Sequence, residues 1–344
     1  MSLLANWKEV IDTANLSAGK RMDFISRWLI ITRAAVFSMT GISGLIGGLL
    51  ALATVGRIDG LNFVLAWVGL LIAHASNNMI NDFFDLEAGV DTQDYARAQY
   101  APHPILGGLI SRRGLGLAIL AFNLVDALIL LVLFLRTGWP VLVFAALGLF
   151  ISVFYVAPPI RLKHHGLGEP GVFLVWGPLM IGGTYFVSAG VLPPAGVWWA
   201  CVPYALVVTT VLIGKHIDKR KADEAKGIRT IPVLIGEQAS LSVNLGLMVA
   251  YYIIVLALVL TGTLGPWVLL VAAALPRLRR VWKIYREPRP EKPPENYPVW
   301  PLWYVAAAFY HNKLAGGMFV LGLALNLLVP WIIRALPGIA LRIP

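Results

Sequence analysis

The sequence predicts an all-α fold, a polytopic membrane bundle of about nine transmembrane helices. Hydrophobic residues make up 58% of the 344-residue chain and charged residues only 13%. A soluble domain carries about 45–50% apolar and about 25% charged residues. The apolar residues are also gathered into runs of about 20, the length that a helix needs to cross the hydrocarbon layer of a bilayer.

Nine apolar runs are candidates for the spanning helices, and the first and last could be kinked or partly interfacial. The eighth is the weakest, because it opens at Gly265-Pro266 and ends in the basic stretch from Arg277 to Arg280. We expect the polar, amphipathic segment 1–27 to lie in the cytoplasm and residues 28–344 to form one transmembrane domain. The expected spans are residues 28–55, 61–80, 114–135, 139–157, 171–192, 196–214, 241–262, 264–282 and 301–334.

The loops between these runs alternate in charge. One set is rich in lysine and arginine, while the other holds only Arg57 and Arg136, with Arg334 and Arg342 near the far end. Positive residues gather on the cytoplasmic side of a membrane, so we expect a cell-membrane protein whose N-terminus and polar clusters face the cytoplasm. Its topogenic residues account for the net charge of +10, and we expect no nucleic-acid partner. The basic set is Lys8, Lys20, Arg21, Arg27, Arg97, Arg112, Arg113, Arg161, Lys163, the stretch 215–229 and the stretch 277–292.

Acidic and amide side chains end the second run. At about 100° per residue, Asn78, Asp82 and Asp85 lie within roughly 60° of one another on a helix. Gly89 is expected to end that helix and to let Asp91 curl back toward the stripe. Carboxylate and amide oxygens suit Mg²⁺, which also bridges to phosphate oxygens. The alternative is an ordinary solvated helix end, although acids that begin inside an apolar run are costly without a use.

A second polar cluster follows the sixth run, in residues 214–232. Asp218 and Asp223 lie there among a larger number of basic residues, including Lys219. Two interpretations stay open for this cluster. Its charges could serve only to set the topology, or its acids could hold a metal ion or a diphosphate between charged partners.

Further basic residues could bind phosphate. The loop 155–169 joins the fourth and fifth runs, and in it Arg161 can bind a phosphate as a bidentate fork and Lys163 as a point charge. Arg33 stands near the start of the first apolar run. A buried arginine needs a partner, and an anionic ligand would serve.

These three segments, in this order, resemble the UbiA superfamily of intramembrane prenyltransferases, over roughly residues 28–240. The stretch N-D-F-F-D at 81–85, with G-V-D-T at 89–92, is similar to the 1,4-dihydroxy-2-naphthoate branch of that superfamily. The loop Y-V-A-P-P-I-R-L-K at 155–163 looks like the same branch. The run G-I-R-T-I-P-V-L-I-G at 227–236 is similar to the tail of the family's second motif.

The resemblance implies a helical bundle around a central cavity that opens sideways to lipid. It also implies that a prenyl diphosphate is ionised with Mg²⁺ and that a small, hydrophobic or aromatic, quinone-precursor-like acceptor attacks the allylic cation. Matching positions give three groups: catalytic residues, Asp82, Asp85 and Asp223; metal ligands, Asn78, Asp82, Asp85, Asp91 and Asp223, with Asp218 as a further candidate; and substrate-binding residues, Arg33, Asn78, Tyr155, Arg161, Lys163 and Lys219.

The sequence departs from the family pattern in two places. His216 and Lys219 stand seven and four residues before Asp223, where the family usually has acids, and Asp218 is offset from their helix face by about 140°. We hypothesise that Lys219 replaces part of a second Mg²⁺ ion. The competing account is a one-residue helical shift that returns Asp218 to the metal. The basic-proline signature also lacks its arginine and reads A-P-H-P at 101–104.

Two rival functions remain open. A terpene cyclase of the same superfamily would use the same Mg²⁺ chemistry without an acceptor. A cation-coupled transporter would place acids along an ion path, but transporters often break their helices near mid-membrane, and the acids here lie at span ends.

Overall fold

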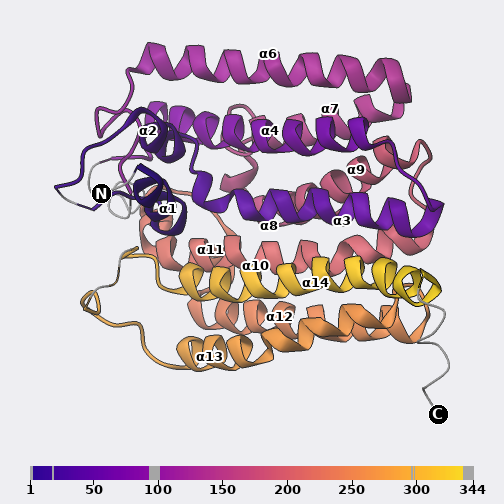
Figure 1. Cartoon of the computed structure of the whole chain (residues 1–344). Helices are drawn as coiled ribbons and strands as arrows, with labels where there is room; N and C mark the ends of the chain where they lie inside the picture. The colour runs from indigo at the N-terminus through magenta and orange to yellow at the C-terminus, as the bar shows by residue number, and fades with distance from the viewer. Residues whose placement is uncertain (1–2, 18, 93–100, 296, 298, 336–344) are drawn as a thin grey trace.

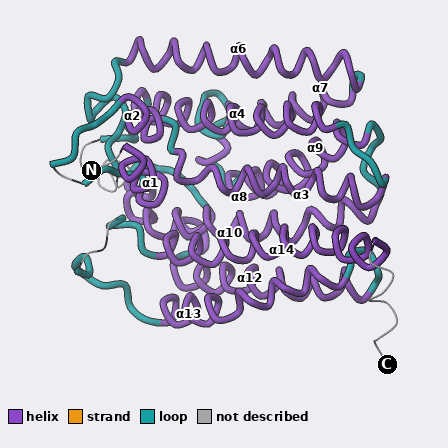
Figure 2. The backbone as a smooth tube through the Cα atoms, viewed as in Figure 1, coloured by secondary structure: helices purple, strands orange, loops and turns teal. Residues whose placement is uncertain are grey.

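The structure is a computed structural model, and it describes residues 3–17, 19–92, 101–295, 297 and 299–335. These residues form helices and connecting loops, and among them the only β-pairing is a single parallel bridge between His165 and Arg229 (Figure 2). The prediction of an all-α fold is confirmed. The elements are α1 (Leu3–Thr13), α2 (Phe24–Ile31), η1 (Ala34–Val36), α3 (Phe37–Val55), α4 (Gly60–Glu87), α6 (Arg112–Thr137), α7 (Pro140–Phe154), η2 (Leu162–His164), α8 (Gly168–Leu174), η3 (Val175–Leu179), α9 (Met180–Ala189), α10 (Ala195–Ala225), α11 (Ile231–Ile235), α12 (Glu237–Leu260), η4 (Pro266–Ala274), α13 (Leu275–Arg286) and α14 (Tyr304–Ala335).

Seven helices of the described chain are long and apolar enough to cross a membrane, two fewer than the sequence predicts. The predicted span 139–157 is only the 15-residue helix α7, about 22 Å long at 1.5 Å per residue. The predicted span 264–282 is the 3₁₀-helix η4 followed by α13. Because a 3₁₀-helix rises about 2 Å per residue, the pair is about 36 Å long, but α13 carries five basic residues, so the pair is not apolar over that length.

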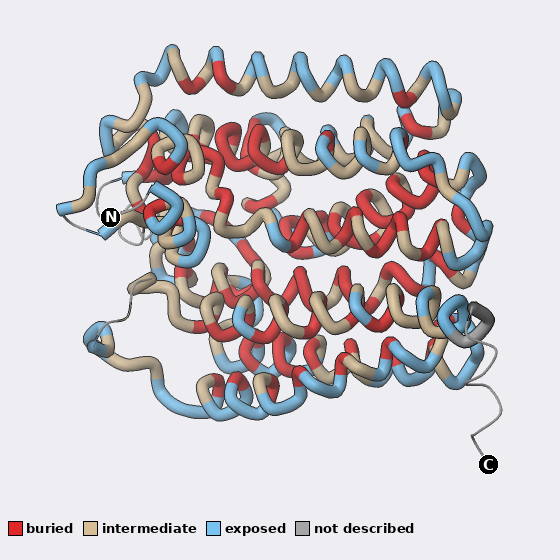
Figure 3. Tube along the Cα trace, in the orientation of Figure 1, coloured by how far each residue is buried: buried red, intermediate tan, exposed pale blue. Residues whose placement is uncertain are grey.

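The long helices lie lengthwise beside one another (Figure 1). Helix α10 packs against α12, α14 and α8, and the largest cluster of buried apolar side chains surrounds it. Helix α6 is different, because it packs mainly on α4 and α7 and most of its side chains are exposed or half-buried (Figure 3). An apolar helix with such an open face suits contact with lipid.

The first predicted span is broken near its start. Helix α2 ends at Ile31, and Arg33 takes a left-handed backbone conformation, φ 55° and ψ 46°, before η1 and α3 begin. Such a conformation costs an arginine about 1–2 kcal/mol. The break turns the Arg33 side chain toward the end of α4, where the acidic stripe lies.

Helix α4 ends as the sequence predicts. Its last helical residue is Glu87, and Gly89 has a φ of +67°. The backbone N–H of Asp91 then donates to the carbonyl of Asp85 at 3.0 Å. The chain therefore folds back, and Asp91 is brought beside the stripe.

Candidate active site

The acids of α4 are buried at the end of the bundle where α1 and α2 also lie (Figure 1). Asp82 is fully buried and paired with Arg33, whose Nε lies 3.3 Å from Asp82 Oδ2 and whose Nη2 also donates to the carboxylate. The Nδ2 of Asn78 donates to the carbonyl of Thr32 at 2.9 Å and so fixes the break after α2. Two predicted residues far apart in the sequence, Arg33 and Asp82, thus form one buried ion pair.

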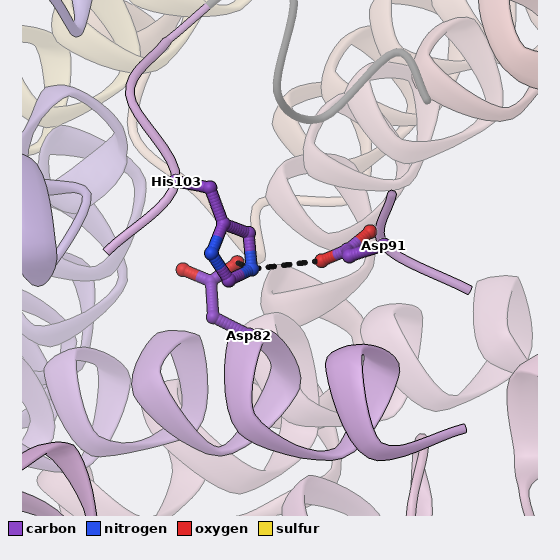
Figure 4. A group of neighbouring side chains, drawn as sticks. All are labelled: Asp82, Asp91 and His103. Carbon is purple, nitrogen blue, oxygen red and sulfur yellow. Dashed lines mark ion pairs between the residues drawn. The ribbon is translucent and has the colours of Figure 1, made fainter. Parts of the chain in front are cut away.

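Asp82, Asp91 and His103 converge from α4, the turn after it and the next loop (Figure 4). One ligand atom of each lies within 4.8 Å of the others. His103 Nε2 is 3.3 Å from Asp91 Oδ2 and 3.8 Å from Asp82 Oδ1. Burial alone would raise the pKa of Asp91, but His103 and the nearby cations Lys219 and Arg33 hold it below its ordinary value. The Asp91 carboxylate is therefore ionised at neutral pH.

Asp85 is held by a lysine from another part of the chain. Lys163 is buried, and its Nζ lies 2.8 Å from both carboxylate oxygens of Asp85. The loop 155–169 delivers this lysine through a backbone bond from Lys163 N to Tyr155 O at 3.0 Å. Arg161 is half-buried in the same loop, and it does not line the polar pocket formed by the described residues. The structure brings Lys163 to the acids but leaves Arg161 aside.

Helix α10 presents Lys219 and Asp223 to the same region. Both side chains are buried, with Lys219 Nζ 3.7 Å from Asp223 Oδ1. The helix is unbroken from Ala195 to Ala225, so the one-residue shift proposed as the competing account does not occur.

Asp218 points to a different place, and its assignment as a metal ligand is wrong in this structure. Its carboxylate accepts the backbone N–H groups of Trp303, Tyr304 and Val305 at 2.9, 3.0 and 3.0 Å. These are N–H groups at the start of α14, which need an acceptor because no earlier turn supplies one. Arg289 adds an ion pair at 3.7 Å. Asp218 caps α14 from the opposite face of α10.

Sequence reasoning did not identify three other residues of this region. His103 belongs to the acidic group, Glu169 accepts from His216, and Lys215 lines the pocket. The stretch A-P-H-P at 101–104, where the family has a basic-proline signature, was the feature of the sequence that could have pointed to His103. Glu169 ends the stretch G-L-G-E at 166–169, which is also similar to the family, but its partner could not be found locally because His216 is 47 residues away.

A small polar pocket opens beside a large apolar cavity. The cavity has a volume of about 910 Å³, within the range of about 300–1,000 Å³ for ligand sites. Four residues line both spaces, namely Arg33, Asn81, Tyr155 and Lys215. Along α4 the cavity reaches from Asn81 to Ala66, about 22 Å at 1.5 Å per residue. An anionic head with a long apolar tail would match this shape.

The residues present fit a divalent cation. Asp82 and Asp91 offer carboxylate oxygens, the ligands that Mg²⁺ prefers. His103 Nδ1 accepts the backbone N–H groups of Ile105 and Leu106 at 3.2 and 3.3 Å, so Nε2 carries the ring proton and faces Asp91 as a donor, not as a metal ligand. Asp91 Oδ2 is buried and has no well-formed hydrogen bond to a described residue. Buried polar atoms rarely stay unsatisfied in this way, and a cation held by the carboxylates of Asp82 and Asp91 would satisfy it.

Fold and site together define a helical protein with spans long enough to cross a membrane and a buried, charged pocket beside a large apolar cavity. The UbiA prenyltransferase family matches residues 41–312. The chain belongs to this family, and it is an enzyme of the prenyltransferase class.

Relatives in this family act on different acceptors, as their names say. The chain is 22% identical over 253 residues to 1,4-dihydroxy-2-naphthoate octaprenyltransferase of Bacillus subtilis, covering 72% of this chain and 78% of the relative. It is 26% identical to 2-carboxy-1,4-naphthoquinone phytyltransferase of Synechocystis, covering 72% and 79%. It is also 28% identical to digeranylgeranylglyceryl phosphate synthase of Natronomonas pharaonis, covering 65% and 76%.

Solved structures share the fold. A UbiA homologue from Aeropyrum pernix aligns with a TM-score of 0.63 at 17% identity, covering 84% of this chain and 97% of the homologue. A UbiA homologue from Archaeoglobus fulgidus bound to GPP and Mg²⁺ aligns with a TM-score of 0.60 at 15% identity, covering 87% and 99%.

Proposed function

We propose that this chain transfers a prenyl group from a Mg²⁺-bound prenyl diphosphate to a small aromatic acceptor within the cell membrane. The observation that carries the proposal is the junction between the two spaces. Buried acids and cations surround the polar pocket, and the 910 Å³ apolar cavity begins where that pocket ends. The bond between the diphosphate and the prenyl chain would lie at this junction, and the junction would face the cytoplasm.

The charges of the pocket support diphosphate binding. The cations Arg33, Lys163, Lys215 and Lys219 stand among the acids Asp82, Asp85, Asp91 and Asp223. Without ligands the described charges nearly balance, so a diphosphate needs additional positive charge. Mg²⁺ held by Asp82 and Asp91 would supply it by neutralising phosphate oxygens. Asp85 would exchange part of its contact with Lys163 for the ligands, and Lys163 and Lys219 would bind phosphate oxygens directly.

The cavity wall suits a carbocation and an aromatic acceptor. His74 and Trp176 line the cavity and meet edge to face, with ring centroids 5.2 Å apart. The Phe37 ring is tilted against His74 with ring centroids 5.3 Å apart, and Thr40 Oγ1 lies within hydrogen-bonding distance of His74 Nδ1, at 2.7 Å. Aromatic faces attract cations by about 2 kcal/mol or more when desolvated. The two naphthoate and naphthoquinone relatives support an aromatic acceptor as well.

The test is to identify the product. Purified protein receives Mg²⁺, geranyl, farnesyl or geranylgeranyl diphosphate, and either a panel of phenolic and naphthoic acceptors or glycerol phosphate derivatives. We expect a prenylated aromatic compound in mass spectra. A hydrocarbon formed without any acceptor would show a cyclase instead, and a prenylated glycerol derivative would refute the aromatic acceptor.

A matched pair of variants links the product to the site. Asp82→Asn removes a charge from the proposed metal group and should slow transfer by at least about a hundredfold. Asp59→Asn is the control at the opposite end of α4, where Asp59 accepts from Asn62 N at 3.0 Å. Asparagine caps helices as well as aspartate does, so this variant should keep its activity. Equal rates in both variants would refute the proposed site.

A further inference from the structure

Tyr155 is joined to a buried histidine and a buried glutamate. Its hydroxyl lies 3.3 Å from His216 Nε2, and His216 Nδ1 lies 2.7 Å from Glu169 Oε1. His216 and Glu169 are each 1% exposed. Gly168 makes room for this arrangement, since a Cβ there would stand 3.0 Å from Cε2 of the Tyr155 ring. Three side chains from a loop, α8 and α10 thus form one chain of hydrogen bonds.

The hydrogen bonds around Glu169 indicate their direction. Glu169 Oε1 also accepts the backbone N–H of Ile231 at 3.1 Å, which fits an ionised carboxylate that only accepts. His216 Nδ1 then donates to Glu169, and Nε2 is left as an acceptor in the neutral ring. The Tyr155 hydroxyl therefore donates to His216 Nε2. Its own oxygen lone pairs remain available to a group in the active site.

Tyr155 also lies at the junction of the two spaces, where the reacting bond would lie. It is one of the four residues that line both the polar pocket and the apolar cavity, whereas His216 lines only the polar pocket. The other three residues of the junction are two cations, Arg33 and Lys215, and the amide Asn81. Among these four, Tyr155 is the one whose hydroxyl contacts the buried pair of His216 and Glu169.

We propose that Tyr155, His216 and Glu169 accept the proton that the acceptor loses in prenyl transfer. This inference rests on the proposed function. When the acceptor carbon attacks C1 of the prenyl group, the C1–O bond breaks and diphosphate keeps its electron pair. The new C–C bond leaves a hydrogen on a cationic acceptor ring. That proton passes to the Tyr155 oxygen, the Tyr155 proton passes to His216 Nε2, and the C–H electron pair restores the ring.

The buried glutamate then stabilises the product of this step. The imidazolium of His216 gains an ionic partner at 2.7 Å in a water-poor site, where opposite charges interact more strongly than in water. Glu169 acts as a positioning residue that fixes the ring and its tautomer, while Tyr155 touches the reacting group. The bound diphosphate is the competing proton acceptor, and the experiment separates the two.

The experiment uses an acceptor deuterated at the carbon that is prenylated. Ionisation limits the wild-type rate in this scheme, so deuterium should leave that rate unchanged. Tyr155→Phe and Glu169→Gln should lower kcat by about a hundredfold, the usual contribution of a positioned proton acceptor, and proton loss should become slow enough for deuterium to lower the rate further. Release of diphosphate without acceptor should fall much less than prenyl transfer in these variants, because ionisation precedes the relay.

The control is a second tyrosine–histidine pair outside both spaces. Tyr252 Oη lies 2.8 Å from His311 Nε2 between α12 and α14, and neither residue lines the cavity or the polar pocket. Tyr252→Phe should show no isotope effect and near wild-type kcat. A Tyr155→Phe enzyme with no isotope effect, or with acceptor-free release equally impaired, would overturn the relay. Failure of the proposed function looks different, because the wild type itself would then make no prenylated product.

Discussion

Asp218 and Lys219 are neighbours in sequence, and we expect their substitution by alanine to affect different properties, stability in one case and activity in the other. Asp218 accepts three backbone N–H groups at the start of α14, and Lys219 lies in the polar pocket. Asp218→Ala should therefore destabilise the fold and spare the chemistry. Lys219→Ala should do the reverse, because it removes a cation that we propose binds the diphosphate.

The expected loss for Asp218→Ala follows from its contacts. A hydrogen bond to a charged group contributes about 1.5–3 kcal/mol. The three bonds share one carboxylate, and the freed N–H groups can recruit some water, so we take about 1 kcal/mol for each. The ion pair with Arg289 is not counted separately, because its closest atoms are 3.7 Å apart, near the 4 Å limit for an ion pair. The unfolding free energy should fall by about 3 kcal/mol, a large share of the usual 5–15 kcal/mol.

The assay is unfolding in detergent together with the turnover of the folded fraction. Glu224→Ala is the matched control on the same helix, because Glu224 is an exposed acid that pairs with Arg220 at 3.2 Å. Such surface pairs contribute about 0–1 kcal/mol, so this variant should melt with the wild type. An Asp218→Ala protein that melts with the wild type but does not turn over would show that the carboxylate serves the active site after all.

Three further outcomes are expected. Gly214→Ala should cost about 1–3 kcal/mol by overpacking, since its Cβ would stand 2.9 Å from the Val305 backbone, whereas Gly116→Ala, with nothing within 4 Å, should be neutral or slightly stabilising in thermal unfolding. In a protein whose single cysteine, Cys201, has been replaced, a cysteine introduced in place of Arg57 should react with an impermeant maleimide in intact cells. A cysteine in place of Lys221 should not react, and the reverse pattern would overturn the predicted orientation. Lys219→Asp should need more Mg²⁺ and respond to it more steeply, because a second ion must replace the lysine, and an unchanged Mg²⁺ dependence would contradict that role.

The acidic stripe on α4 could be predicted because it depends only on local geometry. Asp82 and Asp85 share a helix face through the fixed rotation per residue, and Gly89 ends the helix through its positive φ. The apolar run at 139–157 predicted too long a helix, because its residues stay apolar past Phe154, where α7 ends. The residue before a proline is disfavoured in a helix, and Pro158 follows in the loop.

Which side of α10 faces the polar pocket could not be predicted from its sequence. Two thirds of its most apolar window is buried, so the helix meets protein on most of its sides, and periodicity does not say which side faces the cluster. Asp218 and Lys219 were both plausible site residues for that reason. Only the position of α14, which begins about 85 residues later in the chain, decides that Asp218 is a cap.

The two departures of α10 from the family pattern have different consequences for charge. At position 219 a cation replaces the usual acid, and it stays in the pocket near Asp223 and Asp91. At position 216 the usual acid is replaced by a histidine, yet a carboxylate is still close, because Glu169 lies directly behind the ring. The carboxylate of Glu169 therefore lies behind the His216 ring, and that ring separates it from the pocket where we propose that the diphosphate binds. Such an arrangement binds metal less well than a row of acids, and it can take up a proton that a row of metal-bound acids could not.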